Sequence, residues 1–147
     1  MSFTLESLFV GSIEGEGVFT NSWTRSERRF LVDIVGTWDG RVLTLQEDFV
    51  YDDGEKDHKT WRFEKKAPGV YDGRREDVVG VARDWTEEAA VRLEYAVKLG
   101  GVVLNFADTL EPRGDGSVLN RARVSKWGVP IGRVELAMRP VRAAPQS

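Results

Sequence analysis

The fold is decided most clearly by residues 89–110, which read AAVRLEYAVKLGGVVLNFADTL. Apolar side chains recur at every second position from Ala89 to Leu99, and charged side chains fill most of the positions between them. The same alternation continues from Val102 to Leu110, with Asp108 among the apolar set. A period of two indicates a β-strand with one buried face, and Gly100-Gly101 supplies a turn between the two runs. The stretch therefore predicts two neighbouring antiparallel strands.

Similar runs and turns fill the rest of the chain. Alternating runs predict strands at 30–38, 41–51, 118–126 and 130–140, and Asp39-Gly40 predicts a two-residue hairpin loop between the first two. Strands that follow one another through short turns favour an all-β, antiparallel up-and-down meander, closed into a barrel of about eight to ten strands. A flattened sandwich is the alternative. Helical turns are expected only at 4–9 and 86–90.

Length and composition bound the class of protein. The 147 residues are expected to form a single domain, with a core at about 9–140 and a disordered tail at 141–147. The net charge is -3, and no long basic run offers a surface for nucleic acid. The absence of cysteine excludes disulfides and thiolate chemistry. The single histidine, His58, lies in a polar stretch, so neither a catalytic triad nor a zinc site is expected, and no cofactor is predicted.

Several sequence blocks occur in an order that resembles the DUF3833 family of uncharacterised bacterial proteins. The resemblance covers about 9–140 and rests on 15–19 (GEGVF), 45–54 (LQEDFVYDDG), 61–63 (WRF), 71–73 (YDG), 77–82 (DVVGVA), 119–121 (LNR), 125–129 (SKWGV) and 132–136 (GRVEL). It implies a lipocalin- or calycin-like barrel and a lipid setting, without an assigned activity. The family tends to show paired aspartates and a tryptophan at 106–110, where this chain has a single acidic residue, Asp108.

The location of the protein is predicted from its first residues and its apolar runs. Many members of the resembled family carry an N-terminal lipid anchor, but Met1–Val10 shows neither a lipid-attachment motif nor a signal peptide. No apolar run approaches the roughly 20 residues that span a bilayer. We therefore expect a cytoplasmic protein without a transmembrane segment.

Candidate ligand-binding residues are polar groups that share a face with core side chains. Glu47, Asp108, Asn120 and Lys126 meet this test, and Tyr51 and Tyr95 add hydroxyl groups on apolar rings. One interpretation is a satisfied network in the barrel wall, in which Glu47 or Asp108 pairs with Lys126 or an arginine. The other is a pocket lining that binds the polar head of a ligand. A shift of one residue in register would reverse every assignment.

Arg121 and the five tryptophans each allow two interpretations. Alternation places Arg121 on the outer face, where it could pair with Glu111, or at the barrel rim, where it could bind an anionic head group. The tryptophans, several of them near turns, are expected to plug the barrel ends more than to surround a ligand.

The predicted function is the binding of a small hydrophobic or lipid-like ligand inside the barrel. The alternative is an enzyme that acts on a lipid-like substrate through an inward carboxylate, such as Glu47 or Asp108, as acid or base. No residue is assigned a catalytic role, and the sequence leaves the ligand and the oligomeric state open.

Overall fold

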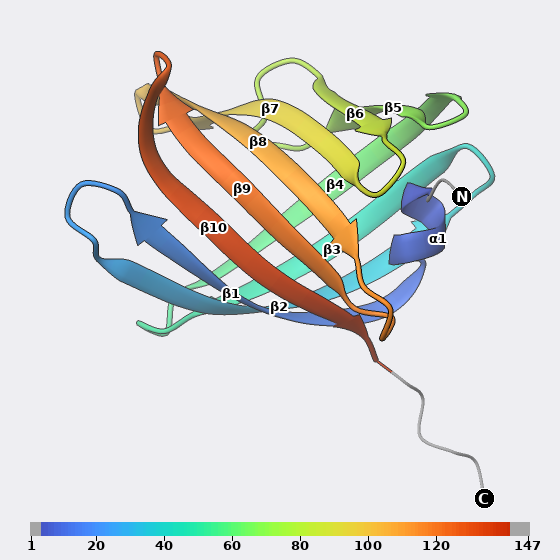
Figure 1. The fold of residues 1–147 in the computed structure, drawn as a ribbon, viewed down its shortest axis with the longest axis horizontal. Helices are drawn as coiled ribbons and strands as arrows, with labels where there is room; N and C mark the ends of the chain where they lie inside the picture. Colours follow the sequence, from blue (N-terminus) through green and yellow to red (C-terminus); the bar gives the residue numbers. More distant parts are fainter. Residues whose placement is uncertain (1–3, 142–147) are drawn as a thin grey trace, which may run out of the picture.

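The computed structural model describes residues 4–141, which form one closed antiparallel barrel preceded by a short helix (Figure 1). The elements are α1 (Leu5–Phe9), β1 (Gly11–Asn21), β2 (Glu27–Trp38), β3 (Val42–Tyr51), β4 (Lys56–Ala67), β5 (Val70–Arg74), β6 (Ala82–Thr86), β7 (Val91–Leu99), β8 (Val102–Pro112), β9 (Val118–Lys126) and β10 (Val129–Pro140). This arrangement confirms the predicted all-β meander and excludes the flattened sandwich. The predicted disordered tail lies outside the described residues, except for Val141.

The strands pair in chain order, and the first strand closes the barrel on the last. β1 pairs antiparallel with β2 on one side and with β10 on the other, where Gly17 lies opposite Leu136. Closure leaves no sheet edge to pair with another chain, which is the physical advantage of a meander that returns to its start.

The hairpin at 89–110 forms as the alternation predicts. Leu99 lies opposite Val102, so Gly100-Gly101 is a two-residue loop. The predicted loop at Asp39-Gly40 is wrong in its length, because Trp38 lies opposite Leu43. The Asp39 carboxylate accepts hydrogen bonds from the backbone N–H groups of residues 41 and 42, which fixes this wider turn.

Helix α1 covers one end of the barrel, at the right in Figure 1. Thr4 caps it, and Leu5 and Phe9 bury their side chains in the core. Its last residue lies directly over Gly36, where a Cβ atom would come within 1.6 Å of the Phe9 carbonyl oxygen. A glycine is therefore required at residue 36 by close approach of two backbones.

The second predicted helical turn, at 86–90, is wrong. Thr86 ends β6 and lies opposite Val91 at the start of β7, and Glu87 N–H donates to the carbonyl oxygen of Ala90. Pairing between strands overrides the local helical tendency of the intervening residues.

The two halves of the barrel interior differ in burial. Inward side chains near α1 are buried, as at Ile34, Leu43 and Val91. Several inward side chains toward the opposite end keep part of their surface exposed, although Val97 and Val124 beside them are buried; the partly exposed ones are Phe19, Phe30, Phe49, Tyr51, Leu104 and Phe106. The interior is thus more completely buried at the helix end than at the other, and we call these two parts the closed half and the open half.

The tryptophans only partly follow their prediction as end plugs. Trp61 is buried and Trp38 packs against the core. Trp23 and Trp127 lie at hairpin tips of the open half with exposed fractions of 71% and 88%, so they plug nothing.

Candidate functional site

Four of the predicted residues meet in the middle of the barrel, where the closed half gives way to the open half. Glu47 comes from β3, Tyr95 from β7, Asp108 from β8 and Asn120 from β9, and each alternates with outward-facing neighbours. Arg75, which follows β5, interacts electrostatically with Glu47 and Asp108. We call these five residues the interior polar cluster.

Asp108 is the best-connected member of the cluster. Its Oδ2 accepts a hydrogen bond from the Tyr95 hydroxyl at 3.2 Å and a longer one from Asn120 Nδ2 at 3.4 Å. Its Oδ1 and the Asn120 Oδ1 are buried, and neither has a hydrogen-bond partner within residues 4–141. Burial raises the pKa of Asp108 to about 7, although the hydrogen bonds from Asn120 and Tyr95 and the charge of Arg75 act in the opposite direction.

Glu47 is a second interior carboxyl group with a raised pKa. Part of its side chain reaches solvent, but Oε1 is buried and has no partner in the described chain. Burial raises its pKa to about 7; the charge of Arg75 opposes this rise, whereas Asp108 adds to it. Near neutral pH, both carboxyl groups of the cluster therefore exchange protons with solvent.

Arg75 is the functional residue that alternation missed. Its guanidinium lies 4.7 Å from the centre of the Trp61 ring and 5.6 Å from that of Tyr95. It binds both carboxylate oxygens of Asp77 at 2.5 Å and 3.0 Å, and Lys59 lies 3.4 Å from the same carboxylate. Arg75 lies beyond the end of a strand, where a period-two pattern says nothing about direction.

Asp84 is a second residue that the pattern missed. It is only 2% exposed, and neither of its carboxyl oxygens has a partner among the residues described. Burial raises its pKa to about 8, with a further contribution from Asp108. In the short run ARDWT, the large apolar residue is Trp85, which favours the opposite face as the buried one. Only the pairing of Asp84 with Leu93 shows that it faces inward.

The remaining predicted residues lie outside the interior polar cluster. Tyr51 is at the open half, with the Arg28 guanidinium 3.8 Å from its ring centre. Arg121 is exposed on the outer face, 3.8 Å from Glu111, as its first interpretation expected.

Lys126 does not take the role of a partner for the interior carboxyl groups. Its ammonium lies 4.7 Å from the exposed Trp127 ring. Residues 4–141 show no ion pair of Lys126 with Glu47 or Asp108, which is one of the pairings that the wall-network interpretation allowed beside a pair with an arginine.

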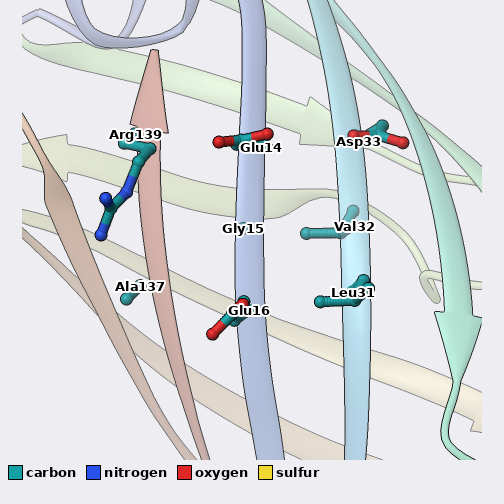
Figure 2. A pocket seen from close by; sticks show the side chains of 8 residues that line it. All are labelled: Glu14, Gly15, Glu16, Leu31, Val32, Asp33, Ala137 and Arg139. Carbon is teal, nitrogen blue, oxygen red and sulfur yellow. The ribbon is translucent and has the colours of Figure 1, made fainter. Parts of the chain in front are cut away.

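The outer wall carries an open hollow that is separate from the cluster. It lies over β1, β2 and β10, and Figure 2 shows Glu14 and Glu16 between Arg139 on one side and Asp33 on the other. Its charged side chains alternate with the inward ones of the same strands.

The described residues show two further absences. Residues 4–141 contain no group of three or more His, Cys, Asp or Glu side chains placed to hold a metal ion. Over the same range, no helix is long and apolar enough to cross a bilayer.

Comparison with known proteins gives one family and several similar folds. The family model described as "Protein of unknown function (DUF3833)" matches residues 1–140. No curated protein matches the sequence.

Solved structures share the barrel. The structure of the S-type phycobiliprotein lyase CPES from Guillardia theta has a TM-score of 0.70 at 10% identity, and the match covers 97% of this chain and 95% of that one. The crystal structure of Rv2717c from M. tuberculosis has a TM-score of 0.63 at 16% identity, with coverages of 92% and 94%. At such identities the likeness shows the fold, and it fits the predicted calycin-like barrel.

Proposed function

We propose, for a chain that belongs to the DUF3833 family, that the open half of the barrel binds one small, largely apolar or lipid-like molecule. The polar group of this ligand lies against the interior polar cluster. The apolar body lies among the aromatic side chains toward the open end.

The buried oxygens without partners carry the proposal. Glu47 Oε1, Asp108 Oδ1 and Asn120 Oδ1 are each buried with no partner within residues 4–141. A buried polar atom left without a hydrogen bond costs on the order of 1–3 kcal/mol. A fold retains such atoms more readily where a bound molecule or ordered water completes them. One of the three lies on β3 and two lie on the neighbouring strands β8 and β9, and together they support a binding site.

The aromatic lining supports an apolar body for the ligand. Tyr95 and Phe106 stack with ring centres 5.1 Å apart, and Phe30 and Phe49 lie 5.8 Å apart across two neighbouring strands. All four rings face inward and are partly exposed. Apolar and aromatic walls around a few polar groups are typical of sites for small ligands.

A matched pair of substitutions on β8 tests the proposal. Leu104 faces inward at the open half, whereas its neighbour Val103 faces outward and is exposed. A tryptophan at residue 104 occupies the proposed site, and a tryptophan at residue 103 adds the same bulk outside it. We expect the neutral fluorophore N-phenyl-1-naphthylamine to bind the wild-type protein and Val103→Trp equally. Leu104→Trp should bind it at least roughly tenfold more weakly, a change of about 1.4 kcal/mol.

Two results would contradict ligand binding in the interior. The first is an absence of saturable binding by the wild-type protein. The second is an equal loss of affinity in both variants, with thermal melting showing both to be folded. Native mass spectrometry of protein purified from its own host gives an independent measurement, because a retained ligand adds a discrete mass.

Catalysis on the bound molecule is the second candidate function, and the pKa values of the two interior carboxyl groups favour it. Glu47 and Asp108 both have a pKa of about 7, which suits a general acid or base at neutral pH. Glu47→Gln and Asp108→Asn should then fail to restore the phenotype of a deletion strain. If both variants restore it fully, acid–base catalysis by these groups is excluded.

A further inference from the structure

We infer that the polar group of the ligand is a cation with several N–H donors, of the protonated amine class, held by Glu47, Asp108 and Asn120. This inference rests on the proposed binding function and specifies its chemistry. The inference excludes a fatty acid or another anionic amphiphile as the ligand.

The hydrogen-bonding groups of the interior polar cluster favour a ligand that donates hydrogen bonds. Within the interior polar cluster, the buried side-chain atoms without partners in the described chain are Glu47 Oε1, Asp108 Oδ1 and Asn120 Oδ1. Two of these are carboxyl oxygens, and the third is an amide carbonyl oxygen, which only accepts. The Tyr95 hydroxyl and one N–H of Asn120 Nδ2 donate to Asp108 Oδ2, and Arg75 Nε and Nη2 donate to Asp77, so these three oxygens receive no hydrogen bond from the cluster within residues 4–141. An ammonium group has three N–H donors and no acceptor, and this matches the three free oxygens.

The charges of the cluster favour a positive group. Arg75 is already paired with Asp77 through two hydrogen bonds, and Lys59 lies 3.4 Å from both Asp57 and Asp77. Glu47 and Asp108 make no ion pair within residues 4–141.

The remaining charged groups near the two carboxyls make the interior more negative. Glu76 and Asp77 act on Glu47, and Asp84 and Asp108 repel one another. Each ionised carboxylate in this setting lacks a counter-ion, which a bound cation supplies. A bound carboxylate would add a further negative charge.

Apart from Arg75, which is paired with Asp77, the cationic side chains among the predicted site residues lie away from the cluster. Arg121 is on the outer face beside Glu111, and Lys126 lies against the exposed Trp127 ring. The aromatic rings at the cluster already accommodate one cation, since Arg75 lies over Trp61 and beside Tyr95. The faces of such rings attract positive charge.

Three amphiphiles with the same chain and different head groups test the inference. Dodecylamine, dodecanol and laurate, each below its micelle concentration, are titrated against protein loaded with N-phenyl-1-naphthylamine. We expect dodecylamine to displace the probe at a concentration at least roughly tenfold lower than laurate or dodecanol, as loss of a charge-assisted hydrogen bond implies.

Substitutions that remove one carboxylate assign the effect to the cluster. Glu47→Gln and Asp108→Asn should each weaken dodecylamine binding by roughly tenfold while leaving the affinity for the neutral probe nearly unchanged. Asp33→Asn removes the same charge from the outer wall and serves as the matched control. Both interior variants are isosteric, and thermal melting shows whether each is folded.

The pH dependence gives a second readout. Alkylamines remain protonated at neutral pH, as lysine does, so a pH effect reports on the protein. Because a bound cation stabilises the ionised carboxylates, binding should release protons and tighten between about pH 6 and about pH 8. Calorimetry in two buffers of different ionisation enthalpy measures the protons released.

The outcomes separate the inference from the proposed function. If laurate or dodecanol binds as tightly as dodecylamine, or if both interior variants keep the wild-type affinity for the amine, the cationic head group is wrong while binding in the interior stands. If neither the probe nor any of the three amphiphiles binds the wild-type protein, the proposed function itself fails.

Discussion

The Tyr95 hydroxyl donates to one oxygen of Asp108 at 3.2 Å, and the other oxygen of the same carboxyl is buried without a partner in the described chain. The carboxyl group is thus supported from one side only. Several measurable properties follow from this arrangement and from its neighbours.

Tyr95→Phe should raise the pKa of Asp108 above its value of about 7. Burial is the main cause of that value, and the hydrogen bond from Tyr95 is among the interactions that lower it. Carbon-detected NMR of the side-chain carboxyl signals measures the titration directly. Tyr51→Phe is the control, because its hydroxyl lies on an inward face at the open half but makes no contact with Asp108. A lower pKa in Tyr95→Phe would contradict this account.

Stability should decrease as the pH rises from about 5 to about 8. The pKa of Asp84 is about 8 in the folded chain and 3.8 for an ordinary aspartate, so in this window the folded state binds more protons than the unfolded state. The free energy of unfolding then falls by up to about 1.4 kcal/mol per pH unit for this one group. Urea denaturation at several pH values gives the slope.

Asp84→Asn should reduce that slope, because the amide does not titrate. The comparison uses the slope of stability against pH and not the absolute stability of the variant, because the buried amide also lacks hydrogen-bond partners and lowers stability at every pH. The control is Asp33→Asn on the outer wall, which should keep the wild-type slope. Equal slopes in Asp84→Asn and the wild-type protein would show that Asp84 does not titrate in this window.

Gly36→Ala should destabilise the protein by about 3 kcal/mol, at the upper end for overpacking. The added methyl group would meet the backbone of Phe9, which cannot move without lifting α1 from the barrel end. Gly101→Ala is the matched control, because the space around that residue is open. Chemical denaturation of both variants measures the difference. If the two variants were equally stable, α1 would not be packed as described.

Tyr71→Phe should loosen α1 without opening the rest of the barrel. The Tyr71 hydroxyl accepts a hydrogen bond from the Leu5 N–H at 3.3 Å and donates to the Glu6 carboxylate. Its loss leaves a buried N–H without a partner, at a cost of about 1–2 kcal/mol. Hydrogen exchange at Leu5 should accelerate, while exchange at Val32 in β2 should stay slow. Uniform acceleration across both elements would mean that the hydroxyl supports the whole barrel.

Most of the fold could be predicted from the sequence because one physical rule governs it. Alternation assigned the inward faces of β3, β7, β8, β9 and β10 correctly. The short turns between successive runs indicated that each strand pairs with the next one along the chain. The rule failed at 86–90, where a helical tendency lost to strand pairing, and at Asp39, where side-chain hydrogen bonds widened the turn. Both outcomes are set by contacts within a turn, between Thr86 and Val91 and between Asp39 and the next residues of the chain, which alternation does not describe.

The candidate site was predictable only in part, for the same reason. Glu47, Asp108 and Asn120 follow from their strands, and their contacts show a cluster rather than separate residues. Arg75 and Asp84 could not be found, because one lies beyond a strand end and the other shares a short strand with a large apolar residue on the opposite face. Lys126, one possible partner in the wall-network interpretation, lies at a strand end and its flexible side chain turns toward its neighbour Trp127.

The pairing of β1 with β10 also constrains how the protein is made. Residues 11–21 find their second partner only when residues 129–140 are available, so a chain still being synthesised holds its first strand unpaired on one side. Contacts between the two ends of a chain slow folding, and exposed strand edges in the meantime favour aggregation. The final hydrogen-bond ladder therefore forms only after residues 129–140 have been synthesised.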